Sequence, residues 1–576
     1  MVKLTNKSAD GLQIDLASVL NRYSAVERRE YQIVCIQEIV DSINKGADVL
    51  IDLPTGTGKT LIYAPVVAEV AGCGRRALVL TVTKDSQRRV ASEIGKFDAH
   101  SRPSIVYGIQ EYECPLLHSY AQSWCCAEFK EEFCKPNELG CKVISSEVEY
   151  TQSNLVVTNF SKFILTSRDS PYDLIVLDDS HSFENAKEQA YQISLQFALI
   201  RKLYEGGLQD SALHDMIENF LNLFSEIFDR CVNPGNKEGV IAQEYLVHLA
   251  NLITDKNSQN IKDAIIALEE RRREISWQVY HFIKRCQSPS KYQFYVRKDY
   301  YNTEDLDSGE LISRMDEILN FVIRARFNHS RVVYVTATPG DVRAHASSCT
   351  HREYDSIQLS VTPGPGFTSP EIEGWFDKLL IIVTEDIGDT RQMNFFEKAI
   401  TLATEILRRR NERALVLFKN YRDQENAKPL LSQIFQADRL FFIDNSLQNR
   451  ADLVEELASR SQISLASASS TLWEGINIDG LRLAVVVSPP FIRPHAGHHQ
   501  DYPHFERRML VRLQQGIGRI IRNPGDFGVA VLTDNRFMKY IRRTIFSDEL
   551  RRRSEVLKAD QVLARIDEAF GKWSAS

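Results

Sequence analysis

The segment VLIDLPTGTGKT, residues 49–60, constrains the fold of this chain more than any other stretch. It begins as an apolar run typical of a buried strand, continues as a loop with two glycines, and leads into an apolar stretch that can form a helix. In such a loop, successive backbone N–H groups converge on phosphate oxygens, and the helix N-terminus adds partial positive charge. The segment therefore predicts a parallel α/β sheet that binds a nucleotide at the end of a strand.

The loop gives each of its small or polar positions a role. Gly56, Thr57 and Gly58 form the curve around the α- and β-phosphates. Lys59 reaches the β- and γ-phosphates, and the Thr60 hydroxyl ligates Mg²⁺. These five residues are predicted to bind ATP and its Mg²⁺.

A second strand-like run ends in two carboxylates. Leu174–Leu177 is followed by Asp178 and Asp179, and then by a serine and a histidine. We expect Asp178 on the Mg²⁺ side of the nucleotide and Asp179 as the group that orients the attacking water. Most nucleotide motors carry glutamate at the second position, so the shorter aspartate predicts slower hydrolysis.

A nucleotide held between two lobes also needs positive charge from the second lobe. The segment LQQGIGRIIR, residues 513–522, can supply it. Arg519 and Arg522 lie three residues apart, so on a helix they share one face, and Gln515 lies one turn earlier on that face. We therefore predict that Gln515, Arg519 and Arg522 take part in catalysis.

Other β-rich runs alternate with helical stretches along the 576 residues, a length that requires several domains. The predicted strands form two sets: Val49–Leu53, Ala77–Thr81, Leu155–Thr158, Leu174–Leu177 and Val332–Val335, then Leu379–Val383, Ala414–Phe418, Ile463–Ala466, Leu483–Val487 and Val529–Leu532. Between about 190 and 315, segments such as His214–Cys231 and Ile261–Cys286 instead carry apolar residues at helical spacing. The fold class is thus α/β, with two parallel-sheet lobes, a helical insertion in the first, and a Pro- and Gly-rich linker at 363–370.

Five of the ten cysteines fall within residues 114–141, which indicates a metal or cluster site. They are Cys114, Cys125, Cys126, Cys134 and Cys141. Disulfides are the alternative in an oxidising compartment, and burial as small apolar side chains is another.

The net charge of −7 argues against a surface that is basic throughout, but one channel can still be lined with Lys and Arg. No apolar run approaches the roughly 18 residues that span a bilayer. The N-terminal residues lead into polar sequence and lack the apolar core of a secretory signal. We expect an intracellular enzyme, in the cytoplasm, nucleoid or nucleus, with no membrane partner.

With these elements in order, the chain resembles the XPD/DinG-type helicases of superfamily 2, from about Arg29 to Arg536. Five further stretches carry the resemblance: Arg29-Glu30-Tyr31-Gln32 to the adenine-reading segment, Tyr334–Pro339 to the motif that couples ATP to the nucleic-acid channel, Leu415–Tyr421 to the start of the second lobe, Leu472–Asn477 to the tryptophan–glutamate–glycine motif, and Asp534–Arg536 to the aspartate–x–arginine signature. Asn477 stands where the family usually has aspartate. The resemblance places Arg29, Gln32, Glu474 and Gly475 at the nucleotide.

In this family, an iron–sulfur domain and a helical arch interrupt the first of two RecA-like lobes. The resemblance places the first lobe at residues 1–112, 143–190 and 315–368, the cysteine-rich domain at 113–142, the arch at 191–314 and the second lobe at 369–576. A [4Fe–4S] cluster usually has four thiolate ligands. Cys114 and Cys141 correspond to the family's first and last ligands, Cys134 to the third, and either Cys125 or Cys126 to the second. Zn²⁺ in the same thiolate cage is the alternative.

The resemblance also implies ATP-driven movement on single-stranded DNA in the 5′→3′ direction, with strand separation at a forked duplex. DNA is favoured over RNA, and DNA repair, recombination and defence remain open as pathways. Lys162, Lys419, Arg422 and Trp473 are candidates for phosphate contacts and base stacking, although each also fits an ordinary surface or core position. The alternative function is a nucleic-acid-stimulated ATPase switch or remodeller without processive unwinding, which the departures from the family's motifs favour.

Overall fold

The computed structural model describes residues 11–574 with gaps. The residues outside the description are 1–10, 25, 27–28, 55, 98–101, 115–118, 121–140, 166–171, 191, 232–237, 298–305, 316, 337–341, 355–356, 365–368, 370–373, 375, 437–438, 443–462, 468–477, 479, 491–501, 522–524, 543–547 and 575–576. The linker predicted at 363–370 therefore lies largely outside the described residues.

The first lobe is built on a seven-stranded sheet in which neighbouring strands are parallel. The strand order is β13-β1-β12-β7-β2-β6-β3. The bounds are β1 Asp48–Asp52, β2 Ala77–Thr81, β3 Ser104–Val106, β6 Leu155–Asn159, β7 Leu174–Asp178, β12 Arg331–Thr336 and β13 Leu359–Thr362. Because β12 lies between β1 and β7, the residues that follow these three strands meet at one edge of the sheet.

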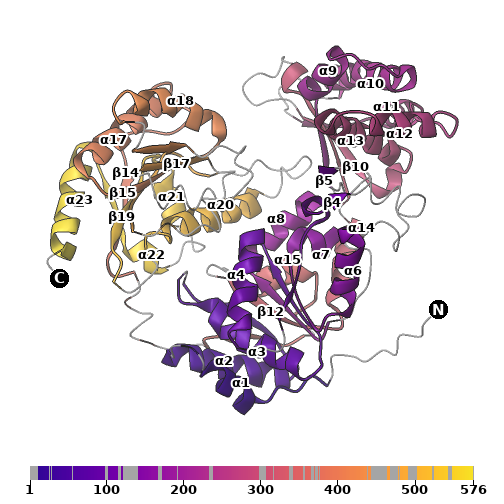
Figure 1. The fold of residues 1–576 in the computed structure, drawn as a ribbon. Helices are drawn as coiled ribbons and strands as arrows, with labels where there is room; N and C mark the ends of the chain where they lie inside the picture. The colour runs from indigo at the N-terminus through magenta and orange to yellow at the C-terminus, as the bar shows by residue number, and fades with distance from the viewer. Residues whose placement is uncertain are drawn as a thin grey trace.

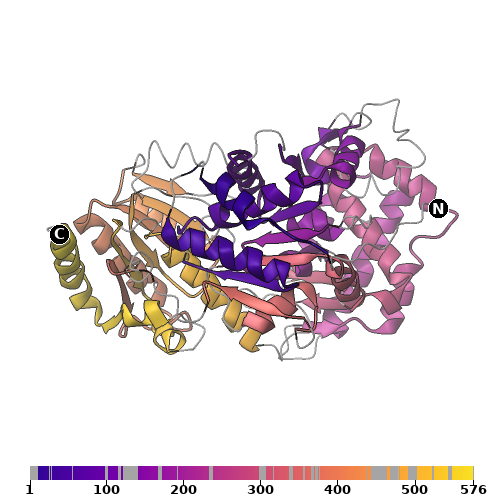
Figure 2. The ribbon, with the colours of Figure 1, turned by 90° about the horizontal axis from the view of Figure 1, so that it is seen from below.

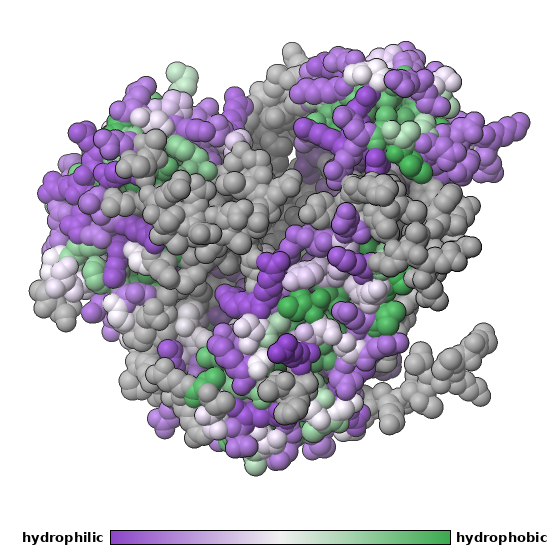
Figure 3. Space-filling view, viewed as in Figure 1, coloured by the Kyte–Doolittle hydropathy of each residue, from purple (hydrophilic) through white to green (hydrophobic). Residues whose placement is uncertain are grey.

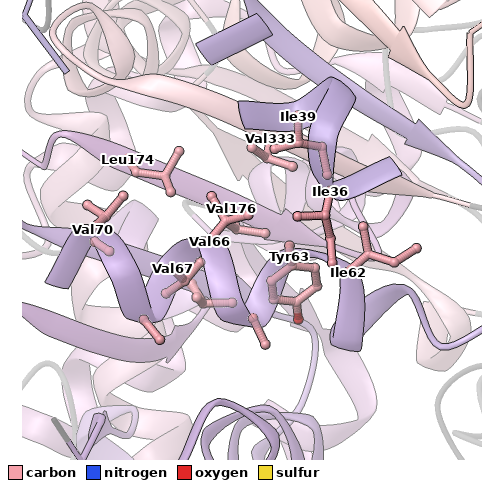
Figure 4. Packing of buried hydrophobic residues seen from close by; sticks show 14 of the residues in the cluster. Ile36, Ile39, Ile62, Tyr63, Val66, Val67, Val70, Leu174, Val176 and Val333 are labelled. Carbon is pink, nitrogen blue, oxygen red and sulfur yellow. The ribbon is translucent and has the colours of Figure 1, made fainter. Parts of the chain in front are cut away.

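Helices cover both faces of this sheet (Figures 1 and 2). One face carries α1 Leu16–Tyr23, α2 Glu30–Asn44, α3 Lys59–Gly72 and α4 Lys84–Gly95. The other carries α6 Lys142–Gln152, α7 Phe160–Leu165, α8 His181–Ala190, α14 Glu317–Phe327 and α15 Val342–Thr350. Strand β7 shows the two-residue alternation, since Leu174 and Val176 enter the first core and Ile175 and Leu177 the second. Figure 4 shows apolar side chains of α2 and α3 packed on the first of these faces.

The insertion between β7 and β12 contains a sheet as well as helices. Its helices are α9 Phe197–Glu205, α10 Ser211–Arg230, α11 Gln243–Ala250, α12 Ser258–Ile266 and α13 Glu270–Cys286. Its strands, β8 Ile193–Gln196, β9 Glu238–Val240, β10 Gln293–Arg297 and β11 Glu310–Arg314, form an antiparallel sheet in the order β8-β11-β10-β9. The predicted helices are present, but the sheet was not expected, because strands of three to five residues leave little periodic signal beside long amphipathic helices. Helices and sheet share one apolar core.

The second lobe is also a seven-stranded parallel sheet, in the order β16-β17-β15-β18-β19-β14-β20. Its strands are β14 Leu379–Thr384, β15 Arg413–Phe418, β16 Leu440–Phe442, β17 Ile463–Ser467, β18 Leu481–Val486, β19 Gly528–Leu532 and β20 Ser554–Leu557. Its helices are α17 Phe395–Arg409, α18 Tyr421–Ser432, α20 Tyr502–Ile517, α21 Phe537–Ile541, α22 Asp548–Arg552 and α23 Ala559–Ser574. Apolar clusters lie on both faces of the sheet. The fold class predicted from the sequence, α/β with two parallel-sheet lobes, is confirmed.

In Figure 3, the coloured surface is mainly hydrophilic, and hydrophobic side chains appear in small areas over the insertion and the first lobe. Among the described helices, none combines the length and the apolar character needed to cross a membrane.

Candidate nucleotide-binding site

The predicted phosphate loop joins β1 to α3 at the carboxyl edge of the first sheet. Gly56 and Gly58 have φ of 92° and 75°, in the left-handed region that favours glycine. A Cβ added at Gly58 would also lie 2.7 Å from Nε2 of Gln32. The Thr57 hydroxyl donates to the Pro54 carbonyl at 2.8 Å, which fixes the curve of the loop.

The loop's cation and hydroxyl stand where the sequence predicts them. Lys59 is the first residue of α3, and its Nζ donates to the Leu53 carbonyl at 3.0 Å and the Pro54 carbonyl at 3.1 Å. Its charge is therefore held over the loop, where phosphate oxygens can compete for it. Thr60 follows in the first turn of α3.

The residues of the predicted adenine-reading segment hydrogen-bond to the backbone of the phosphate loop. Gln32 and Tyr31 are buried, and both donate to the Thr57 carbonyl, Gln32 through Nε2 at 2.9 Å and Tyr31 through its hydroxyl at 2.7 Å. The Gln32 Oε1 accepts from the hydroxyl of Tyr23. Arg29 donates to the Tyr31 hydroxyl at 3.2 Å. Sequence reasoning missed Tyr23, because a tyrosine at the end of an amphipathic helix gives no signal that separates it from ordinary core.

The acid pair ends β7 and begins a tight turn. Asp178 is buried, and its burial, together with the neighbouring carboxylate of Asp179, raises its pKa to about 7. Lys59 and Arg89 of α4 act in the opposite direction. Asp179 is half-buried with φ of 58°, a left-handed conformation that aspartate tolerates better than most residues. The structure thus brings the acid pair and the loop lysine together.

Tyr63 is a further member of this site that the sequence did not reveal. It lies one turn after Thr60 on α3 and is fully buried, and its hydroxyl has no hydrogen-bond partner of ordinary geometry among the described residues. Burial raises its pKa, and the nearby Asp178 carboxylate adds to that increase. Its place in an apolar helical stretch, visible in Figure 4, explains why it looked like core.

The second lobe reaches the acid turn through α20. Gln515 on this helix hydrogen-bonds through Nε2 to Nε2 of His181, the first residue of α8. The predicted helix across Arg519 and Arg522 was wrong, since α20 ends at Ile517. Glycines at 516 and 518 weaken the helix there, and Arg519 is buried in the turn that follows. Arg522 lies outside the described residues.

The family model described as the helicase C-terminal domain matches residues 403–553, and the type III restriction enzyme res subunit matches residues 25–203. A probable ATP-dependent helicase of Methanocaldococcus jannaschii is 22% identical over 640 residues, covering 93% of this chain and 96% of that protein. The 3'-5' exonuclease DinG of Staphylococcus aureus is 18% identical over 324 residues, covering 53% of this chain and 34% of that protein.

The solved structures agree in fold. An XPD helicase structure has a TM-score of 0.64 at 15% identity, covering 92% of this chain and 100% of that chain. The structure of S. tokodaii Xpd4 has a TM-score of 0.54 at 12% identity, covering 92% of this chain and 100% of that chain. Over most of its length the chain is similar to ATP-dependent helicases, and it has the fold of the XPD helicase structures. The helicase is an ATP-hydrolysing enzyme. Its match to DinG spans about a third of that protein.

The described part of the helicase's cysteine-rich segment is compatible with a thiolate-bound cluster. Strand β4 Glu113–Cys114 pairs with β5 Ser119–Tyr120 and packs against α6, which Cys141 precedes. Positions 114 and 141 are therefore close in space, although 27 residues separate them in sequence. Cys141 is buried beside Ile109 and Tyr112 at the N-terminus of α6. Cys125, Cys126 and Cys134 lie outside the described residues, as does the side chain of Cys114.

The remaining motif residues of the helicase divide into two groups. Trp473, Glu474, Gly475 and Asn477 lie outside the described residues. Arg536 is held within its own lobe, since it binds the buried Asp534 through two N–H···O bonds of 2.9 and 2.7 Å and donates to Thr390 at 2.8 Å.

The described candidates for nucleic-acid contacts differ in how far their side chains are exposed. Lys162 is buried, so the structure does not present it as a surface cation. Lys419 forms an ion pair of 3.5 Å with Asp423, while Arg422 is exposed on α18.

Proposed function

We propose that the helicase hydrolyses ATP between its two lobes and uses the energy to move 5′→3′ on single-stranded DNA and to separate a forked duplex, inside the cell. The observation that carries the proposal is the hydrogen bond between Gln515 of the second lobe and His181, directly after the acid pair. This bond joins the turn after the acid pair in the first lobe to α20, the helix of the second lobe that leads to Arg519 and Arg522. The relatives support DNA as the substrate, since one of them is an ATP-dependent DNA helicase, YoaA of Haemophilus influenzae, 23% identical over 183 residues, 28% of this chain and 27% of that protein.

Each residue of the site has a proposed part in hydrolysis. Thr60 and Asp178 would hold Mg²⁺, which neutralises charge on the β- and γ-phosphates when bound. Lys59 leaves the loop carbonyls to bind the same phosphates, and Asp179 orients the attacking water. Arg519 and Arg522 stabilise the charge on the transferred group. Arg29, Gln32, Glu474 and Gly475 complete the nucleotide site.

The cysteine segment is proposed to hold a [4Fe–4S] cluster through Cys114, Cys134, Cys141 and one of Cys125 and Cys126. The burial of Cys141 and the packing of β4 on α6 support this assignment. Visible absorbance of anaerobically purified protein, lost on exposure to air, would establish the cluster. Zinc in a colourless preparation would contradict it.

A polarity-resolved unwinding assay tests the proposed function. Duplex DNA with a single 5′ tail or a single 3′ tail, or with the matching RNA tails, is mixed with ATP and the anaerobically purified enzyme. We expect separation with the 5′ DNA tail, and none with Lys59→Ala. Separation from the 3′ tail alone would overturn the polarity, and turnover that survives both Lys59→Ala and Arg522→Ala would overturn the site.

A second function, an ATPase switch that clamps or remodels nucleoprotein, is favoured by the short side chain of Asp179. That carboxylate must come closer to the water than a glutamate would. ATP hydrolysis stimulated by single strands, without strand separation from any tail, would favour the switch.

A further inference from the structure

Ser180, which follows the acid pair, binds the β12–α15 segment through three atoms. Its backbone N–H donates to the Val335 carbonyl of β12 at 2.9 Å. Its Oγ lies 2.8 Å from Nε2 of His345 on α15, and its carbonyl accepts from Sγ of Cys349, one turn further along, at 3.4 Å. Ser180 and His345 are both buried. The turn that carries the acids is thus fastened to a segment that begins more than 150 residues later in the chain.

These contacts act on a strained part of the backbone. Asp179 has φ of 58°, which costs an L-residue about 1–2 kcal/mol and persists only where neighbouring contacts hold it. The turn closes when Ser182 N–H donates to the Asp179 carbonyl at 2.9 Å and the chain enters α8. Ser180 supplies the peptide unit that follows Asp179, so anything that fixes Ser180 also limits the directions in which the Asp179 side chain can point.

The His345 ring is itself held in place. It stands edge-to-face with the ring of Tyr334, with centroids 6.5 Å apart and planes at 71°. Tyr334 and Thr336 belong to β12, the strand that leads into the motif resembling the ATP-coupling segment. His345 therefore contacts the acid turn on one side and that strand on the other.

We propose that His345 is a positioning residue: through the Ser180 hydroxyl it holds the turn of Asp179 in hydrolytic geometry and couples that turn to the β12–α15 segment. The inference rests on the proposed function, since Asp179 is the proposed water-orienting group. Loss of the contact leaves nucleotide binding intact, because Lys59 and Thr60 belong to another element, but it misplaces the carboxylate. It also weakens the link between hydrolysis and movement of the β12–α15 segment.

A neighbouring contact between α8 and the end of α15 provides a matched control. Lys187 on α8 donates to the Ser348 carbonyl and lies 2.6 Å from Nε2 of His351. Lys187 joins α8 to the end of α15, whereas His345 joins the acid turn to the start of α15. Lys187 lies about two helical turns from Asp179. Lys187→Met should therefore lower the unfolding temperature and leave hydrolysis unchanged.

The test measures ATP turnover with and without single-stranded DNA, nucleotide affinity, and unfolding temperature for Ser180→Ala, His345→Phe, His345→Gln and Lys187→Met. For Ser180→Ala and His345→Phe we expect kcat to fall about 10-fold with KM for ATP within about two-fold, and DNA stimulation to weaken. His345→Gln, which can still hydrogen-bond to Ser180, should recover most of the loss. The double variant Ser180→Ala/His345→Phe should lose no more than either single variant.

Two results would overturn the inference. One is wild-type turnover and stimulation in both Ser180→Ala and His345→Phe. The other is a loss of turnover in Lys187→Met equal to that of His345→Phe at a similar fall in unfolding temperature. That result would show that both contacts only stabilise the packing of the lobe. Lys59→Ala distinguishes failure of the proposed nucleotide site from failure of the proposed role of His345. If Lys59→Ala keeps full turnover, the proposed site is wrong. If Lys59→Ala is inactive and the His345 variants are normal, only the positioning role is wrong.

Discussion

Replacing Arg352 by methionine should destabilise the first lobe without affecting its chemistry. Arg352 and Asp48 form a fully buried ion pair, with Arg352 Nη1 2.7 Å from Asp48 Oδ2. The same carboxylate accepts from the Tyr354 hydroxyl at 2.8 Å and from the Val332 N–H at 2.9 Å. Methionine leaves this charge buried without a cation, a change that costs about 3–5 kcal/mol. The two remaining hydrogen bonds favour the lower end of that range.

A loss of about 3 kcal/mol lowers the unfolding temperature of a lobe of this size by about 6–12 °C. Thermal melts followed by circular dichroism measure the shift. Turnover at 25 °C should stay close to wild type, because Asp48 begins β1 whereas the phosphate loop follows its other end.

Arg324→Met is the matched control, since Arg324 pairs with Glu353 at 3.2 Å with side chains 48% and 70% exposed. An exposed pair of this kind contributes about 1 kcal/mol or less. Equal shifts for the two variants would refute the reasoning that burial makes the Arg352 pair costly to break.

Three further predictions concern the site. Because its folded pKa of about 7 lies above the ordinary value of 3.8, Asp178 makes the nucleotide-free protein less stable as pH rises from about 4 to about 7. Asp178→Asn should therefore raise the unfolding temperature much more at pH 8 than at pH 4, and it should abolish turnover; an equal shift at both pH values would contradict this. Gly58→Ala should weaken ATP binding measured by titration, since it strains φ and pushes on Gln32, and normal affinity would show that the loop has room. Asp179→Asn keeps the size of the side chain but removes the base, so kcat should fall about 100-fold or more in a steady-state assay, and full turnover would remove Asp179 from the mechanism.

Much of the architecture was predictable because the strands of both lobes are buried on both faces. Runs such as Leu174–Leu177 and Val529–Leu532 are continuously apolar and contain two β-branched residues each, and each appears as a strand within one or two residues of its predicted bounds. Strands β3 and β13 escaped notice because they are short, only partly buried edge strands. The sheet of the insertion was missed for a related reason, since its strands are short and separated by long helices.

The site was predictable where a residue type is chemically unusual in its context, as with Lys59 after glycines or paired acids after an apolar run. It was not predictable where an ordinary residue gains its role from the fold. Tyr23 and Tyr63 look like core until the structure places their hydroxyls near Gln32 and Asp178. His345 lies 165 residues from Ser180 along the chain, so no local pattern could join them.

The insertion is attached to the first lobe by two strands that pair with each other. Strand β8 enters it and β11 leaves it, and Ile193 faces Ser313 in their antiparallel register. The points of entry and exit are therefore neighbours in space although about 120 residues separate them in sequence. The sheet of the first lobe does not depend on the residues inserted between β8 and β11. The whole insertion can therefore be enlarged, shortened or exchanged during evolution while the first lobe keeps its shape.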